Sequence, residues 1–133
     1  MTVYFARAKE LSISVTATVD LPEELFCSGD LSIVLSNLVE NALIASQKQP
    51  PSARHIVVMT MCQGNVVNVL VKNRFDAVVE LDEEGLPVTH VRGHGLGMKS
   101  LARFRDKYGA TVFCQQKDGW FTTYIQIPPT ASS

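Results

Sequence analysis

Hydrophobic residues recur at helical spacing between Asp30 and Ser46, and this segment is the clearest element of the sequence. At about 100° per residue its apolar side chains fall within one broad stripe, which is typical of a helix packed on a core. Asp30 is the expected N-cap, and Lys48 with the prolines after it ends the helix. The stripe comprises Leu31, Val34, Leu35, Leu38, Ala42 and Ala45.

Two asparagines lie at the margin of that apolar stripe. Asn37 and Asn41 are four residues apart, so they stack on one face of the helix. An amide at this margin faces a cleft without being sealed in the core. Polar residues are common at such margins, so the pair is read either as boundary residues or as ligand-binding amides.

Short segments rich in β-branched residues predict strands on both sides of a long connection. Leu11–Val19 alternates and is predicted to be a half-buried strand, whereas residues 1–9 show no clear period. Glycine-containing turns join the remaining strands in pairs, which predicts two antiparallel hairpins. The hairpin strands are His55–Gln63 with Val66–Asn73, whose core-facing row ends at Asn73, and Ala110–Gln116 with Phe121–Ile127.

The connection between the hairpins, Arg74–Arg92, has an acidic tip and no sustained period. A connection longer than about 12–15 residues in a compact domain is usually a lid, a binding loop or disordered. Its composition offers little apolar surface to hold it down, so we expect it to be mobile without a bound ligand and more ordered with one. We assign residues 74–92 as a lid.

A glycine-rich segment, Gly93-His94-Gly95-Leu96-Gly97, follows the lid and leads into a predicted helix over Met98–Tyr108. Glycines at the start of a helix let backbone N–H groups approach an anion, and the helix dipole favours its charge. The segment therefore has the outline of a phosphate site. A flexible hinge or tight turn is the alternative, because three spaced glycines are a weak signal alone.

Composition limits the possible classes of protein. The chain has 133 residues, of which 46% are hydrophobic and 19% charged, which predicts one globular domain over residues 1–133. A formal net charge of −1 gives no basic footprint for nucleic acid or anionic lipid. No apolar run is long enough to span a membrane, so no direct membrane contact is expected. Three scattered cysteines fit buried thiols in a reducing cytoplasm.

The order of the elements predicts an α/β two-layer sandwich with a mixed, largely antiparallel sheet and helices on one face. Asn37-Leu38-Val39-Glu40-Asn41-Ala42 resembles the asparagine box of the GHKL (Bergerat-fold) ATP-binding superfamily. Gly93–Gly97 resembles its second glycine box, in the matching order and separation. Within the superfamily the two motifs are most similar to those of sensor histidine kinases of the peptide-sensing, AgrC-like kind.

The resemblance implies ATP and Mg²⁺ as ligands and assigns a role to each matching residue. Asn41 would coordinate the magnesium, and Asn37 would line the phosphate side of the pocket. Both would be catalytic residues. The lid glycines would lie against the phosphates with Leu96 closing over the nucleotide, and Asn73 would bind adenine. His94 and Lys99 are further candidates for phosphate contacts and Thr123 for adenine, although a solvated role or a core position explains them equally well. The lid glycines are Gly93, Gly95 and Gly97.

Two departures from the superfamily pattern bear on chemistry. Asn73 stands where the family has the aspartate of Asp-x-Gly-x-Gly, so the acceptor for the adenine amino group is an uncharged amide. Asn37 stands where hydrolytic members carry a glutamate, so a water-activating base is missing there.

The resemblance predicts the catalytic domain of a two-component sensor histidine kinase, part of a longer, probable membrane-bound receptor. Its γ-phosphate would pass to a histidine on an upstream dimerisation and phosphoacceptor domain and then to a response regulator. Two alternatives stay open: an anti-sigma-factor-type serine kinase of the same superfamily, and a non-catalytic interaction module. No nucleic-acid partner is expected.

Overall fold

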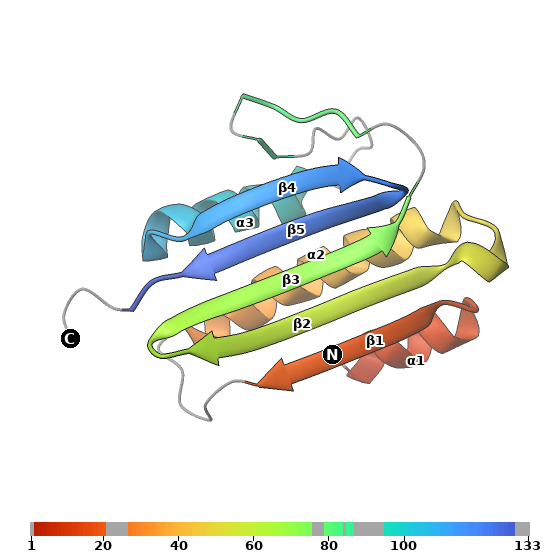
Figure 1. The fold of residues 1–133 in the computed structure, drawn as a ribbon, viewed down its shortest axis with the longest axis horizontal. Coiled ribbons are helices and arrows are strands. Elements are labelled where there is room, and N and C mark those ends of the chain that lie inside the picture. The colour runs from red at the N-terminus through yellow and green to blue at the C-terminus, as the bar shows by residue number, and fades with distance from the viewer. Residues whose placement is uncertain (1, 21–26, 76–78, 84, 87–94, 130–133) are drawn as a thin grey trace.

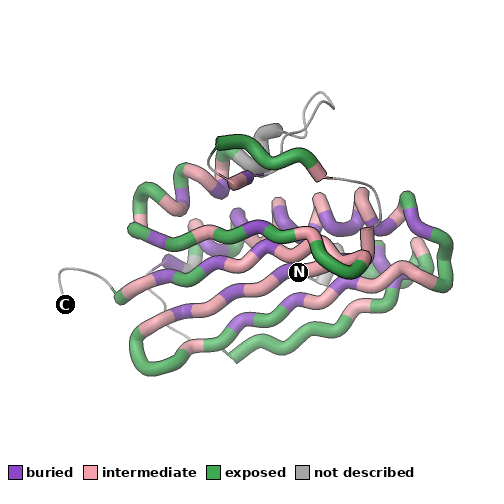
Figure 2. The backbone as a smooth tube through the Cα atoms, turned by 45° about the horizontal axis from the view of Figure 1, so that its top comes forward, coloured by how far each residue is buried: buried purple, intermediate pink, exposed green. Residues whose placement is uncertain are grey.

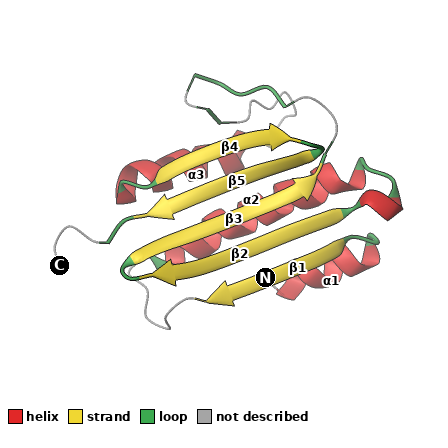
Figure 3. Cartoon of the chain, in the orientation of Figure 1, coloured by secondary structure: helices red, strands yellow, loops and turns green. Residues whose placement is uncertain are grey.

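A computed structural model describes residues 2–20, 27–75, 79–83, 85–86 and 95–129. A five-stranded sheet forms one layer, and helices cover one of its faces (Figures 1 and 3). This arrangement confirms the predicted two-layer sandwich. Along the chain the elements are α1 (Thr2–Glu10), β1 (Ser14–Asp20), α2 (Ser28–Gln47), a 3-10 turn (Pro51–Ala53), β2 (His55–Gln63), β3 (Val66–Arg74), α3 (Gly95–Tyr108), β4 (Thr111–Lys117) and β5 (Trp120–Ile127).

The sheet is mixed and largely antiparallel, as predicted. Its strand order is β1-β2-β3-β5-β4, and only the β1–β2 pair among these is parallel. Both hairpins turn at the glycine-containing segments that the sequence predicted. Gly64 has φ 61°, and Asp118 and Gly119 have φ 54° and 79°, left-handed values that glycine adopts without steric cost.

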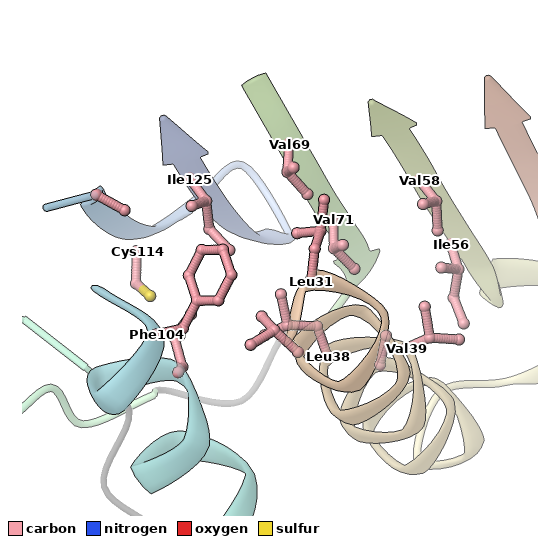
Figure 4. Packing of buried hydrophobic residues seen from close by; sticks show 14 of the residues in the cluster. Leu31, Leu38, Val39, Ile56, Val58, Val69, Val71, Phe104, Cys114 and Ile125 are labelled. Atoms are coloured by element: carbon pink, nitrogen blue, oxygen red, sulfur yellow. The ribbon is translucent and has the colours of Figure 1, made fainter. Parts of the chain in front are cut away.

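The core lies between the sheet and α2, with α3 packed beside α2 (Figure 4). Alternate residues of β3 and β5 are buried, which assigns Val69, Val71 and Ile125 to the helix-facing side. Leu31, Leu38 and other residues of α2 pack on them (Figure 4). The burial pattern therefore follows strand and helix periods along these elements, as Figure 2 shows.

Strand β1 agrees with its prediction only in part. The strand starts at Ser14 instead of Leu11; on the apolar side of Leu11–Val19, Ile13 is buried and Leu11 and Val15 pack against the core, whereas Ala17 and Val19 are exposed, Val19 by 68%. The strand is the edge of the sheet beside β2, so fewer side chains cover its helix-facing side. Residues 2–10, which had no clear period, form α1, and its Ala8 is buried.

Two helix boundaries also differ. Asp30 is not the N-cap of α2: the helix starts at Ser28 after Cys27, and Asp30 lies in its first turn. Helix α3 begins at Gly95, earlier than the expected Met98, so Gly95, Leu96 and Gly97 belong to its first turn. Within the described residues, no helix is both long and apolar enough to cross a membrane.

Candidate functional site

The asparagine pair lies on the edge of α2 that faces α3. Asn37 and Asn41 are half-buried, as the margin position predicted. Further towards the start of α2, the same edge forms a shallow groove with α3, lined among others by Asp30, Val34 and Phe104. The pair therefore continues a row that starts in the α2–α3 interface.

The two helices run antiparallel, which sets the level of the asparagines along α3 (Figure 1). Asp30 near the start of α2 contacts Lys107 near the end of α3. Both helices rise about 1.5 Å per residue. Asn37 and Asn41 lie seven and eleven residues after Asp30 on α2, so on α3 they correspond to positions the same number of residues before Lys107, near the first turn of that helix. On this register Asn37 and Asn41 are level with the beginning of α3.

A polar cluster closes the other end of this interface. Lys107 Nζ donates to Asp30 Oδ2 at 2.8 Å, and the Tyr108 hydroxyl donates to the same oxygen. The hydrogen bond from Lys107, followed by that from Tyr108, lowers the pKa of Asp30, whereas the bond to Asp30 raises the pKa of both Lys107 and Tyr108. The Phe104 and Tyr108 rings pack beside the cluster with centroids 4.7 Å apart. The cluster therefore fixes the end of α3 against the start of α2.

Asn73 on β3 and Thr123 on β5 are buried polar residues on the helix-facing side of two neighbouring strands. Each is 4% exposed, and Thr123 is paired with Val71, two residues before Asn73 on β3. Asn73 Nδ2 donates to the Arg74 carbonyl at 3.3 Å, while its Oδ1 accepts no hydrogen bond from the described residues. That oxygen is an available acceptor.

Cys114 on β4 borders Thr123, and its Sγ lies 3.9 Å from Thr123 Oγ1. Burial raises the pKa of the Cys114 thiol, and the nearby Asp82 carboxylate raises it further against the opposing effect of Thr123. The thiol therefore stays protonated and able to donate a hydrogen bond. Cys27 and Cys114 are buried free thiols as expected, whereas Cys62 is half-buried.

Part of the predicted lid is anchored by the fold. Val79 N donates to Gln116 Oε1 at 2.9 Å, and Gln116 Nε2 donates to the Phe75 carbonyl at 3.2 Å. Leu86 is 3% exposed in the core, and its N–H donates to Asp82 Oδ1 at 3.0 Å. The argument that this segment has little apolar surface to hold it is therefore wrong for Leu86. The mobility of residues 74–92 stays a prediction.

The remaining predicted site residues all belong to the segment that leads into α3 or to α3 itself, and the structure describes only some of them. Gly93 and His94 lie outside the described residues. Gly95, Leu96 and Gly97 form the first turn of α3, which differs from the expected loop before the helix. Lys99 is exposed on α3. Helix α3 thus starts where the resemblance expects phosphate.

The available ligand atoms fit a nucleotide with magnesium better than a protein metal cage. Within the described ranges, no group of three or more His, Cys, Asp or Glu residues is arranged to hold a metal. Magnesium usually keeps several waters and takes one or two protein oxygens besides substrate phosphates. The amide oxygen of Asn41 is a hard ligand of the required kind, and the free acceptor of Asn73 suits an exocyclic amino group.

Sequence reasoning missed two supports of this site. Asp30 was expected to cap α2, but it pairs with Lys107 of α3 across 77 residues of sequence. Gln116, which joins both ends of the segment Phe75–Val79, showed no pattern of its own. Contacts of this kind depend on how elements pack, so no local signal identifies them.

Comparison with known proteins places this geometry in a family. The model of the GHKL domain family matches residues 28–128, from the start of α2 to the end of β5. A comparison with curated proteins gave no match.

Similar solved structures include a nucleotide-free catalytic domain of the histidine kinase ThkA, with a TM-score of 0.76 and 19% identity over 97% of this chain and 88% of that one. Full-length ShkA in complex with AMPPNP has a TM-score of 0.75 and 19% identity, covering 96% of this chain and 28% of that one. The histidine kinase domain of Erythrobacter litoralis EL346 has a TM-score of 0.66 and 20% identity, covering 96% and 58%. These structural similarities confirm the fold. Because the family model matches residues 28–128, most of the chain, the chain belongs to the GHKL domain family.

Proposed function

We propose that this domain binds Mg-ATP between α2, the start of α3 and the helix-facing side of β3 and β5. The observation that carries the proposal is a set of uncharged polar side chains in an otherwise apolar interface. Strand β3 and helix α2 run in the same direction, so the second half of α2 lies behind the end of β3 that bears Asn73 (Figure 1). The set comprises Asn37, Asn41, Asn73 and Thr123.

Each part of the set suits one part of the nucleotide. Asn41 would hold the magnesium, and Asn37 would contact the phosphates together with the first turn of α3, whose N–H groups favour an anion. Gly93, His94 and Lys99 are proposed as further phosphate contacts. At the other end, Asn73 Oδ1 would accept a hydrogen bond from the adenine amino group, and the Thr123 hydroxyl would complete the base pocket.

We further propose that the domain is the catalytic part of a cytoplasmic sensor histidine kinase. The similar structures include ShkA with AMPPNP and ThkA in complex with the response regulator TrrA, which supports ATP and a response regulator as partners here. Bound Mg²⁺ supplies charge neutralisation at the phosphates. The chain's own residues would mainly position the nucleotide, because positioning and electrostatics dominate phosphoryl transfer.

The phosphoacceptor histidine belongs on another domain in this proposal. His55 lies on β2, on the helix-free side of the sheet, where its Nε2 is 3.1 Å from Thr16 Oγ1 and its ring packs edge-on against Trp120. It therefore faces away from the proposed nucleotide. Asn37 also lacks the basicity to activate water, so ATP hydrolysis by the domain should be slow.

Thermal melts with and without Mg-ATP test the binding part of the proposal. A ligand that binds only the native state raises stability by about 2.7 kcal/mol at a hundred times its Kd. We expect the melting temperature to rise with Mg-ATP and to rise less when EDTA removes the metal. A melt that is indifferent to Mg-ATP at millimolar concentration would refute the assignment.

Labelling with γ-phosphate-labelled ATP tests the kinase part. The domain alone should remain unlabelled, whereas a separately made phosphoacceptor hairpin should gain an acid-labile label when mixed with it. An acid-stable label on a partner serine would instead support the serine kinase alternative. Rapid ATP turnover by the domain alone would contradict both.

A further inference from the structure

The face of the sheet opposite the helices has an organisation that nucleotide binding does not use (Figures 1 and 3). Strand alternation assigns every second residue of all five strands to this open face. At one end of the face lies a corner of basic and aromatic side chains. Next to it runs a row of apolar side chains across the sheet.

Trp120 is the centre of the basic corner. Lys72 Nζ lies 4.6 Å from the Trp120 ring centroid, and Arg74 Cζ lies 4.9 Å from it. Lys117 is paired with Trp120 across the β4–β5 hairpin, and His55 packs edge-on against the ring at 5.5 Å. Trp120 therefore lies beside cations from two strands, Lys72 and Arg74 of β3 and Lys117 of β4, and cation–π contacts hold cationic side chains at a surface.

These cations lack acidic partners. Arg74 Nη1 donates to the carbonyl of Asp118 rather than to a carboxylate. Within the described part of the chain, none of Lys72, Arg74 and Lys117 forms an ion pair. The paired strands place one carboxylate on the open face, that of Asp20 opposite Met61, at the far end of the face from the corner. Asp118 in the β4–β5 turn adds one carboxylate beside the corner, against the three cations Lys72, Arg74 and Lys117. The corner therefore keeps a net positive charge in a chain whose formal net charge is −1.

The apolar row crosses the sheet two residues beyond the level of Lys72. Cross-strand pairs align Met59 with Leu70, Leu70 with Tyr124 and Tyr124 with Phe113. Met59 is 38% exposed and Phe113 54%. Met59, Leu70 and Tyr124 also line a shallow hollow with Met61. Exposed methionine and aromatic side chains in contact are typical of surfaces that bind protein.

We infer that the open face docks an acidic, amphipathic segment of a partner protein. Its carboxylates would meet Lys72, Arg74 and Lys117, and its apolar side chains would cover the row that ends at Phe113. The level of Arg74 and the apolar row are four strand residues apart, about 13 Å, which equals about nine residues of helix. A helix with carboxylates near one end and apolar residues about two and a half turns away matches this spacing.

Charge and area favour this occupant over two others. Five strands of about seven residues form a face roughly 23 Å long, which one helix of about 15 residues spans, whereas a stable dimer would need roughly 800 Å² of contact per partner. If two copies stacked their sheets with the same strand ends together, their two basic corners would also face and repel each other. Nucleic-acid binding at physiological salt commonly uses about 6–10 phosphate contacts, more than three cations supply.

Titration of the ¹⁵N-labelled domain with designed peptides tests the inference. The probes are two helical peptides of about 18 residues, about 27 Å long, with identical Leu and Phe positions and with Glu or Lys at one end. We expect the Glu peptide alone to shift signals of β2, β3 and β5 and the Trp120 indole N–H. Lys72→Glu with Arg74→Glu should weaken its binding by about tenfold or more, and Phe113→Ser by several-fold.

Matched variants distinguish the loss of the open-face surface from general effects of changing charge or exposed apolar area elsewhere. Lys9→Glu with Lys48→Glu reverses two exposed charges on α1 and after α2, and Ile33→Ser removes an exposed apolar side chain from α2. Both should leave the affinity for the Glu peptide unchanged. The thermal shift with Mg-ATP should persist in all variants, so failure here is distinct from failure of nucleotide binding.

Several results would overturn the inference. Signal changes confined to the helices, equal binding of the Lys peptide, or full affinity in the charge-reversed double variant would each exclude the proposed docking surface. Tighter binding of a single-stranded oligonucleotide that the double variant loses would reassign the face to nucleic acid. A dimer in sedimentation equilibrium that Phe113→Ser dissociates would reassign it to a second copy.

Discussion

The two ends of the α2–α3 interface differ in the side chains that form them. Where the start of α2 meets the end of α3, buried Leu31, Leu101 and Phe104 pack beside the ion pair of Asp30 with Lys107. Towards the start of α3, the edge of α2 presents half-buried amides instead. The first end, called the apolar end for its buried side chains, can hold the helices together without a ligand. The second, called the polar end, offers the side-chain amides of Asn37 and Asn41, which form no hydrogen bond with the described residues.

This difference separates stability from binding along one pair of helices. Close packing at the apolar end is sensitive to any loss of volume, because protein interiors contain few voids. The amides at the polar end retain contact with solvent, so their removal should affect ligands more than folding. Substitutions at the two ends should therefore have effects of different kinds as well as different sizes.

The largest effect is expected at the apolar end. Phe104→Ala should lower the free energy of unfolding by about 3–5 kcal/mol, since it removes a buried ring and leaves a cavity. Urea denaturation measures this change. Phe113→Ala, on the exposed open face, is the matched control and should cost less than about 1 kcal/mol. Similar losses for both rings would contradict the packing described for α3.

The next effect belongs to the polar end. Asn41→Ala should change the stability of the free domain little but abolish most of the magnesium-dependent thermal shift, up to about 2.7 kcal/mol at a hundred times Kd. Differential scanning calorimetry with Mg-ATP and with ATP plus EDTA separates the metal-dependent part. Asn65→Ala in the β2–β3 turn is the control and should keep the full shift. If Asn41→Ala keeps it as well, Asn41 does not bind the metal.

A smaller effect is expected at the base end. Asn73→Leu removes the proposed acceptor for the adenine amino group and should weaken ATP binding by about tenfold, the effect of roughly 1–1.5 kcal/mol for one hydrogen bond. Asn73→Asp keeps an acceptor oxygen and should bind ATP at least as well as Asn73→Leu. Calorimetric titration measures both affinities. Equal affinity of the wild type and Asn73→Leu would exclude Asn73 from the base pocket.

The smallest effect is expected for the exposed ion pair. Lys107 and Tyr108 lower the pKa of Asp30, so its contribution to stability is present above the unfolded value of about 3.9 and is lost as pH falls through the folded pKa. Lys107 has a raised pKa, so its share is lost at high pH, as pH rises through that value. Asp30→Asn should therefore melt slightly lower than the wild type at pH 7, and the difference should shrink as pH falls below about 3.9. A difference that does not shrink as pH falls would show that the ion pair is not its cause.

Local patterns predicted the elements that depend on local periodicity. The stripe of α2, the turn glycines and the core-facing row ending at Asn73 follow from helix and strand periods, and the structure has them. The exposure of Ala17 and Val19 was not predicted, because the alternation of Leu11–Val19 does not reveal that it becomes an edge strand. Burial depends there on which neighbours cover the strand, and sequence periodicity carries no information about that.

Several residues of the candidate site stand out in the sequence for the same reason, and their roles stay predictions. The asparagines of α2 and the threonine of β5 are visible as polar interruptions of apolar rows. The contacts that position them, Asp30 with Lys107 and Gln116 with Phe75 and Val79, join residues far apart in sequence. Nothing in the sequence distinguishes Leu86 from the other apolar residues of segment 74–92, and only its burial in the core shows that it anchors this segment.

Side-chain amide spectra test the central claim most directly. Asn37, Asn41 and Asn73 carry side-chain NH₂ groups whose ¹⁵N signals report contact with a ligand, and the Tyr108 backbone N–H reports the opposite end of the interface. On addition of Mg-ATP, the three asparagine side-chain signals should shift while the Tyr108 signal stays in place. Unchanged asparagine signals at saturating Mg-ATP, or shifts confined to the Asp30–Tyr108 end, would contradict the proposed site.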